Sequence, residues 1–484
     1  MKDRMYDIVI IGAGIVGTAV ARELSKYKLR IAVFEKNNEI ACGATKANSG
    51  IVYNGHTARP DKLKGRLTLQ GREMFEGLCR ELDVAFKPVD MLIAGFDEED
   101  DAAIEELRKR AAANGITGVR ILGREEALQR EPSLNEGVRS ALLNPGCGIV
   151  DPWELCFALA ENAAANGVEF KLNTEVTGLA TLEDGIAVET AGGTLEAKAV
   201  INCAGINTDL INRMAGSDSF SILPKRGQYA VLDRSAKFQI SHIVAHCKSE
   251  KEKSVFLIPT MHGNVMIGPS MEPTEDRTSK KTTAVQMEKL MKSAHKISRH
   301  IPEQLVIRSF AGLKAKCSAG DFLIQESDEM KGLVHAAGIN NPGLTCSPAI
   351  ASHIADMIAS IYGRIGLALE RNPAFVPNRG SIVSFKSIPD GERNQWIQQH
   401  PGYGRIVCRC EQVTEGEIRE SISRVPGACS VNGVKLRTRA GMGRCQGGFC
   451  GPKVTSLLSQ ELGQQMEQVL YENNGSELLS DSMP

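Results

Sequence analysis

The chain has 484 residues, which is too many for one ordinary hydrophobic core, so two or three domains are expected. Hydrophobic residues make up 42% and charged residues 24%, and glycines or charges interrupt every apolar run of about eighteen residues, so no membrane span is predicted. The 57 basic and 58 acidic residues leave a net charge of −1, so the whole chain has no general field for attracting nucleic acid or an anionic membrane.

A βαβ unit is predicted at the N-terminus. The pattern indicates a buried strand at residues 7–11, a glycine-rich turn, a helix to about Lys26 and a second strand at 30–35. The apolar stretch at 8–20 belongs to this unit rather than to a signal peptide, because Asp3 and Asp7 precede it and glycines interrupt it.

Helices and strands follow along the middle of the chain. Helices are predicted at residues 98–113, 152–166, 283–295 and 345–362. Strands are predicted at 168–176, 186–190, 200–203, 254–259, 265–267 and 332–337. Residues 223–306 mix strands with a lysine-rich helix, and we interpret them as a substrate-side α+β domain inserted between nucleotide-binding segments.

Composition marks the boundaries of the C-terminal part. After a first domain at residues 1–363, residues 364–403 lose periodicity and gather Asn, Pro and Gly, which is typical of a linker. A compact cysteine-bearing domain is predicted at 404–470, and the polar end at 471–484 is predicted to be disordered.

The glycine-rich turn has the pattern of a dinucleotide site. Gly12, Gly14 and Gly17 directly follow a strand and open a helix, and Glu35 ends the next strand, eighteen residues beyond Gly17. The first glycine makes the tight turn, the second lets the backbone approach a pyrophosphate, and the third lets helix and strand pack closely. Glu35 is positioned to accept hydrogen bonds from an adenosine ribose.

The unit alone does not distinguish FAD from NAD, but three later segments resemble one flavoprotein superfamily. A small polar loop at residues 42–50, Gly205 after a strand, and the segment 338–345 make residues 5–360 similar to the D-amino-acid oxidase and glycerol-3-phosphate dehydrogenase superfamily. The resemblance implies FAD, with the last segment passing the flavin ring. The further cofactor-binding positions that it implies are Thr45, Asn48, Ser49, Gly205, Gly338, Gly343, Leu344 and Thr345.

Four clustered cysteines need a separate account. Cys408 and Cys410 form C-x-C, and after 34 residues Cys445 and Cys450 form C-x-x-x-x-C. Four thiolates suit zinc or an iron–sulfur cluster, but structural zinc usually takes C-x2-C pairs. The surrounding sequence resembles the bacterioferritin-associated ferredoxin-like domain, which implies a [2Fe-2S] cluster on these four cysteines. Zinc and reduced thiols stay as alternatives.

The predicted fold is therefore α/β: a Rossmann-like FAD-binding domain with the inserted α+β substrate domain, followed by a small helical [2Fe-2S]-binding domain.

Basic residues crowd the approach to the second cysteine pair: Lys435, Arg437, Arg439 and Arg444. They are interpreted in two ways. They either raise the reduction potential of the cluster or dock an acidic electron carrier, or they form a solvated basic strand.

The order of flavin domain, linker and cluster domain is similar to the A subunits of anaerobic glycerol-3-phosphate dehydrogenases, and to flavoproteins acting on 2-hydroxy acids such as L-2-hydroxyglutarate or on amino acids. Three departures weaken the case for a phosphate-bearing substrate. Tyr53 stands where the family commonly has His, and Lys314 stands where the glycerol-phosphate enzymes have Arg. An Arg-Tyr pair of the family is also replaced by Thr57-Ala58. Nearby basic residues that would compensate are Arg59, Lys62, Lys64 and Arg226.

The expected chemistry is hydride transfer from a C–H to flavin, with a base taking the O–H or N–H proton and a cation holding the substrate's anionic group. His56 is the first candidate for the base, His262 the second, and Lys314 the candidate anion clamp. A lone histidine is more often structural than catalytic.

Three classes of function stay open: a dehydrogenase of a small anionic substrate, a peroxide-forming oxidase with a structural tail, and a non-catalytic electron-transfer subunit. The complete glycine motif and the four spaced cysteines favour the dehydrogenase.

Most of the 13 cysteines stand singly in apolar surroundings, which is typical of a reducing compartment, so a cytoplasmic location is expected. A one-electron carrier or a separate acceptor subunit is the expected partner, and any membrane association would come through that subunit.

Overall fold

The first domain is built on a parallel sheet. In the computed structural model, which describes residues 5–247 and 254–479, five parallel strands lie in the order β9–β2–β1–β12–β20. Their bounds are β1 Met5–Ile11, β2 Ile31–Phe34, β9 Glu169–Lys171, β12 Gly193–Asn202 and β20 Leu333–Ala337. Antiparallel strands extend this sheet: β10 (Val176–Leu182) and β11 (Gly185–Thr190) beyond β12, and β19 (Leu323–Glu326) beyond β20. The predicted Rossmann-like arrangement is confirmed.

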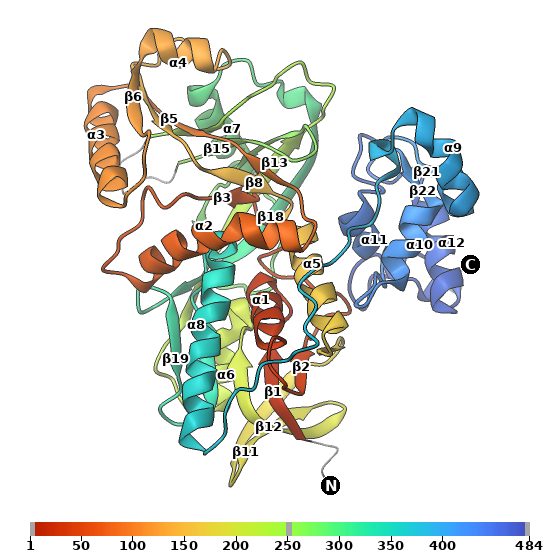
Figure 1. Cartoon of the computed structure of the whole chain (residues 1–484). Helices are drawn as coiled ribbons and strands as arrows, with labels where there is room; N and C mark the ends of the chain where they lie inside the picture. The colour runs from red at the N-terminus through yellow and green to blue at the C-terminus, as the bar shows by residue number, and fades with distance from the viewer. Residues whose placement is uncertain (1–4, 248–253, 480–484) are drawn as a thin grey trace.

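Helices cover this sheet. They are α1 (Ile15–Leu24), α2 (Leu63–Glu81), α5 (Pro152–Ala165), α6 (Thr208–Met214) and α8 (Gly343–Arg364). The α1 helix contacts both α5 and α8, and α8 also contacts α2 (Figure 1). By length and composition α8 is the one helix among the described residues that is apolar enough to cross a membrane, but 67% of its apolar window is buried inside the protein. Its apolar surface therefore belongs to the core of the domain.

A second, nine-stranded sheet forms the substrate-side domain at the other end of the molecule (Figure 1). Its strands are β5 (Met91–Gly95), β6 (Arg120–Gly123), β7 (Ser140–Asn144), β13 (Ile222–Leu232), β14 (Ile243–His246), β15 (Phe256–Pro259), β16 (Val265–Gly268), β17 (Glu272–Pro273) and β18 (Val306–Cys317). The insertion is thus larger than residues 223–306, because β5 pairs with β14 and brings the segment 91–144 into the same sheet.

Three helices and a small sheet complete this end of the molecule. The helices are α3 (Glu98–Ala113), α4 (Arg124–Arg130) and α7 (Ala284–Ile297). A three-stranded sheet joins β3 (Ile51–Val52), β8 (Gly148–Val150) and β4 (Phe86–Pro88). The β3–β8 pairing brings the loop after β2 next to the segment that leads into α5.

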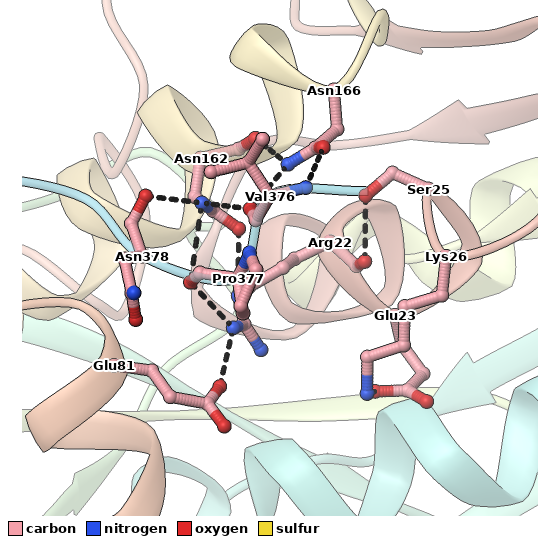
Figure 2. A network of polar contacts seen from close by, with 10 residues as sticks. All are labelled: Arg22, Glu23, Ser25, Lys26, Glu81, Asn162, Asn166, Val376, Pro377 and Asn378. Atoms are coloured by element: carbon pink, nitrogen blue, oxygen red, sulfur yellow. Dashed lines mark hydrogen bonds and ion pairs between the residues drawn. The ribbon is translucent and has the colours of Figure 1, made fainter. Parts of the chain in front are cut away.

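The segment after α8 is a linker that is fastened to the first domain. It runs back along α1 and α5 towards the C-terminal domain (Figure 1), and backbone carbonyls at 376–378 accept hydrogen bonds from side chains of these helices (Figure 2). Arg22 donates to Pro377 O at 3.1 Å, and Asn162 donates to Val376 O at 3.0 Å. The predicted linker also contains α9 (Asp390–Gln399).

The C-terminal domain has its own core. Its elements are β21 (Ile406–Cys408), β22 (Val413–Thr414), α10 (Glu415–Ser423), α11 (Val431–Thr438) and α12 (Gly451–Leu462). Thr414 and Glu417 form a capping box that fixes the start of α10. Apolar side chains such as Val434 and Leu458 are fully buried within this domain.

Two local predictions differ from the structure. The strand expected at 168–176 is divided into β9 and β10, because Asn173 takes a positive φ of 50° and the chain turns there. The end predicted to be disordered from residue 471 is placed as far as 479, and Glu472 forms ion pairs with Lys46 and Lys280. Residues 480–484 lie outside the described part of the chain.

Candidate active site and cluster site

One large cavity lies between the two sheets. Its volume is about 1330 Å³, above the roughly 300–1,000 Å³ usual for small-ligand pockets, so it has room for a dinucleotide together with a substrate. Residues of the glycine turn, β2, the loop 42–49, β18 and the start of α8 line it. The C-terminal domain also supplies part of the wall, which sequence reasoning did not predict.

The glycine turn has the geometry of a phosphate cradle. Gly12 has a φ of 103°, and a Cβ there would lie 2.5 Å from Cys203 O, so only glycine fits the turn. A Cβ on Gly17 would lie 2.0 Å from Gly12 O, which is the close approach of helix and strand that was predicted. A Cβ on Gly14 would meet only Thr45 Oγ1, at 3.4 Å, and would otherwise fill space in the cavity. This open space fits a pyrophosphate at the N-terminus of α1.

The predicted cofactor-binding positions divide into those that line the cavity and those that do not. Most of the predicted residues line the cavity: Gly12, Gly14, Glu35, Thr45, Asn48, Ser49, Gly205, Gly343 and Leu344. The Glu35 carboxylate is held there by hydrogen bonds from Ala13 N at 3.0 Å and Asn37 N at 2.9 Å. Gly17, Gly338 and Thr345 do not line it. Thr345 is fully buried, and its hydroxyl accepts a hydrogen bond from Tyr53 N at 3.1 Å.

The two candidate bases lie in different surroundings. His56 is buried away from the cavity lining, its Nδ1 lies 3.0 Å from Asn54 Oδ1, and burial lowers its pKa to about 4. His262 lines the cavity, and its Nε2 lies 3.1 Å from Asp151 Oδ2. Burial lowers the pKa of His262, and the Asp151 carboxylate acts in the opposite direction. Of the two histidines, only His262 is placed to meet a substrate.

Lys64, Lys225 and Lys314 are among the lysines that line the cavity. Lys225 on β13 and Lys314 on β18 stand directly opposite each other in the antiparallel pair, so their side chains lie on the same face of the sheet. Lys64, at the start of α2, lies 3.3 Å from Asn340 Oδ1, and burial lowers its pKa. Sequence reasoning named Lys314 and Lys64 but missed Lys225, because the pairing of β13 with β18 has no local signal.

The other basic residues considered from sequence are not at this site. Arg59 and Lys62 are absent from the cavity lining, and Arg226 is paired with Glu272 at 2.6 Å. Tyr53, which departs from the family pattern, does line the cavity, and its hydroxyl is hydrogen-bonded to Asn341. Burial raises the pKa of Tyr53, so this side chain presents a neutral phenol.

The four predicted ligand cysteines form two close pairs. Cys410 Sγ lies 3.5 Å from Cys445 Sγ, and Cys408 is hydrogen-bonded to Cys450. Among the described residues, no three or more His, Cys, Asp or Glu side chains are already arranged around a single ion. Two pairs of sulfurs suit a two-iron cluster, in which each iron takes two protein ligands.

The loop around these cysteines fits a negatively charged cluster. Backbone N–H groups of Glu411 and Gly441 point to the Cys408 sulfur, and those of Gly447 and Phe449 point to Cys445. A Cβ on Gly443 would lie 2.3 Å from Cys410 Cβ, so the loop packs tightly against Cys410. Donors aimed at the sulfurs stabilise thiolate charge, as [2Fe-2S] ligands require.

The basic residues of this domain have structural partners. Arg437 pairs with Glu39 at 2.9 Å, Arg439 with Glu411 at 2.9 Å, and Arg444 with Asp233 at 2.7 Å. Two of these contacts, at Glu39 and Asp233, join the cluster domain to the rest of the chain. The interpretation as a solvated basic strand is therefore wrong for Arg437, which is buried on the helix α11, whereas Arg444 is 67% exposed. The interpretation as a docking surface stays a prediction.

Family comparisons agree with this division of the chain. Residues 7–357 match the family described as FAD dependent oxidoreductase, and residues 406–460 match the BFD-like [2Fe-2S] binding domain. The chain belongs to the FAD-dependent oxidoreductase family. It is an oxidoreductase that uses FAD and carries a C-terminal [2Fe-2S]-binding domain, as the sequence predicted.

Individual relatives span different parts of the chain. This chain is 40% identical over 476 residues to glycerol 3-phosphate dehydrogenase of Caloramator mitchellensis, and the match covers 98% of each chain. It is 30% identical to L-2-hydroxyglutarate dehydrogenase of Escherichia coli, over 55% of this chain and 64% of that one. Among solved structures, dithionite-reduced L-alpha-glycerophosphate oxidase of Mycoplasma pneumoniae with FAD bound superposes with a TM-score of 0.73 at 28% identity, over 77% of this chain and 98% of that one.

Proposed function

We propose that this protein is a dehydrogenase of glycerol 3-phosphate, which it oxidises by hydride transfer to FAD, and that the electrons leave through the [2Fe-2S] cluster. The observation that carries the proposal is the pair Lys225 and Lys314, which stand opposite each other on the cavity wall. Two ammonium groups on one stretch of the cavity wall suit an anionic substrate group, because each can donate a charge-assisted hydrogen bond to it. A phosphate monoester carries nearly two negative charges at pH 7, which suits two ammonium groups better than one carboxylate does.

Different residues of the chain have different roles in the proposed reaction. Lys225 and Lys314, with Lys64, hold the phosphate and so orient the carbon that loses hydride. His262 accepts the hydroxyl proton, and Asp151 orients its ring and stabilises the imidazolium that forms. FAD, held by the glycine turn, Glu35 and the loop 42–49, supplies the acceptor for the hydride. The product is the corresponding ketone.

The relative with matching length supports the same substrate, because it is a glycerol 3-phosphate dehydrogenase that covers 98% of this chain and so includes the cluster domain. The partial match to L-2-hydroxyglutarate dehydrogenase keeps a 2-hydroxy acid as the second candidate. That substrate also carries two negative charges, so it tests the alternative directly.

A substrate panel with a dye acceptor tests the proposal. We expect turnover with glycerol 3-phosphate and a loss of at least about 100-fold in kcat/KM with glycerol, which lacks the phosphate that the lysines hold. L-2-hydroxyglutarate, an amino acid and D- and L-lactate complete the panel. Preference for any of these over glycerol 3-phosphate would reject the proposed substrate.

We also propose that the protein works in the cytoplasm with a separate electron acceptor, either a one-electron carrier or a membrane-bound subunit. This proposal is supported by the cluster domain, since a [2Fe-2S] cluster passes one electron at a time. Rapid formation of hydrogen peroxide by the intact protein in air would instead indicate an oxidase.

A further inference from the structure

One face of a helix in the cluster domain lines the cofactor cavity. Asn432, Lys435 and Leu436 on α11, and Arg439 directly after it, follow the spacing i, i+3, i+4 and i+7 that places side chains on one side of a helix. An adjoining side of α11 is packed against the first domain, where a Cβ on Gly433 would lie 1.9 Å from Glu39 Oε1. The helix is therefore fixed as a wall of the cavity rather than loosely apposed to it.

Lys435 differs from the other cations at this wall. Lys46 is paired with Glu472, Arg439 with Glu411, and Arg308 donates to Gln446 at 3.2 Å. Lys435 is only 7% exposed, yet within residues 5–247 and 254–479 its ammonium group has no hydrogen-bond or ion-pair partner. Its ammonium nitrogen is not among the fully buried polar atoms that lack a partner, so it opens onto the cavity that Lys435 lines, where an anionic group of a bound ligand can contact it.

The surroundings of Lys435 place this anion within the cofactor cavity. Its Cδ lies 3.9 Å from where a Cβ of Gly441 would be, so the side chain passes the cluster loop, and the residue also lines the cavity. Burial and the positive charges of Arg308 and Lys46 lower its pKa to about 8, so it stays largely protonated at neutral pH. Of the four cations named at this wall, Lys46, Arg308 and Arg439 have protein partners among the described residues, and Lys435 has none.

We infer that Lys435, supplied by the cluster domain, is a binding residue for an anionic group of the FAD cofactor. Two parts of FAD have this chemistry: the pyrophosphate, and the flavin ring once it is reduced. In either case the domain that holds the cluster also completes the flavin site, so the two cofactor sites are coupled through one side chain. FAD binding is measured without substrate, so the inference does not depend on the proposed glycerol 3-phosphate activity.

Three full-length variants test the inference. Lys435→Met removes the charge and keeps most of the volume, and Lys435→Arg restores the charge. Lys453→Met is the control, because Lys453 is an exposed lysine of α12 in the same domain, away from the cavity. For each, the FAD dissociation constant is measured after flavin removal and titration with FAD, and the midpoint potential of the bound flavin is measured by redox titration.

Loss of one charge-assisted contact should raise the FAD dissociation constant of Lys435→Met about 10- to 100-fold if the anion is the pyrophosphate. If the anion is the reduced ring, oxidised FAD binds as before, but the midpoint potential falls because reduced flavin loses an equivalent factor of 10 to 100 in affinity. In both cases Lys435→Arg should recover most of the effect, and Lys453→Met should resemble the unmodified protein.

The inference is overturned if Lys435→Met leaves both quantities unchanged while its cluster absorbance and circular dichroism are those of the unmodified protein. It is also overturned if Lys435→Met changes only the KM for glycerol 3-phosphate, because the anion would then be the substrate. If Lys435→Arg is as impaired as Lys435→Met, the defect is one of packing and the assigned role is wrong.

Discussion

At the scale of single residues, the three glycines before and within α1 have different reasons to be glycine. Gly12 needs its positive φ, and Gly17 needs the absence of a side chain where helix and strand meet. Gly14 has an ordinary extended backbone, with a φ of −80°, and open space beside it. Only Gly14 can therefore be replaced without disturbing the fold while still blocking the cofactor.

Gly14→Val should abolish tight FAD binding and leave the protein folded, because the valine side chain would occupy the space left for the pyrophosphate. FAD occupancy of the purified protein, measured from its visible spectrum, checks this. Gly77→Val in α2 is a suitable control, since a Cβ there meets nothing within 4 Å and lies outside the cavity. Full flavin occupancy in Gly14→Val would show that the cofactor lies elsewhere.

Lys314→Met should lower kcat/KM for glycerol 3-phosphate on the order of 30- to 1000-fold, which corresponds to roughly 2–4 kcal/mol for a lost charge-assisted contact in a dry site. FAD binding should be unchanged. Lys289→Met serves as control, because Lys289 is an exposed residue of α7 away from the cavity. An unaltered kcat/KM in Lys314→Met would remove this lysine from the substrate site.

At the scale of elements, α11 ties the cluster domain to the flavin domain. Arg437 lies over the Phe157 ring of α5 at 4.1 Å and pairs with Glu39 at 2.9 Å, and both charged side chains are almost fully buried. Glu39 also accepts hydrogen bonds from Cys429 N at 2.7 Å and Ser430 Oγ at 3.3 Å. This junction keeps the cluster loop and the cofactor cavity in a fixed relation.

Arg437→Met should destabilise the protein by about 3–5 kcal/mol, because it leaves the Glu39 carboxylate buried without its cation. Arg213→Met is the matched control: Arg213 pairs with Asp218 at the same distance of 2.9 Å, but both side chains are exposed, so about 0–1 kcal/mol is expected. Chemical denaturation of both variants measures the free energies of unfolding. Equal effects would mean that the Glu39 pair contributes no more than a surface pair.

At the scale of the whole molecule, the chain joins a two-electron site to a one-electron site. The cavity and the cluster loop share residues, since Met442 and Gln446 line the cavity and flank Cys445 within the loop. The cluster loop therefore borders the cofactor cavity directly. The exposed Cys410 marks the side of the cluster loop that an outside acceptor can approach.

Cys445→Ser should spare reduction of the flavin by substrate in a single anaerobic turnover and slow steady-state transfer to the physiological acceptor. Stopped-flow absorbance and a steady-state assay separate the two steps. Cys429→Ser is the control, because Cys429 donates to Asn38 O at 2.7 Å as a serine can, and it should keep the cluster. Undiminished transfer by cluster-free Cys445→Ser protein would exclude the cluster from the route.

The sequence by itself determined the features that depend on local patterns. The glycine turn, the helix at 98–113 and the cysteine spacing follow from short-range geometry, so they were predictable, and the resemblance to known families supplied the cofactors. Tertiary structure decided what depends on distant pairing. The β5–β14 pairing enlarges the substrate-side sheet, the β13–β18 register places Lys225 opposite Lys314, and the docking of α11 brings Lys435 to the cavity. No local pattern encodes these contacts, because they join segments far apart in the chain, and only burial of the shared core selects among their possible partners.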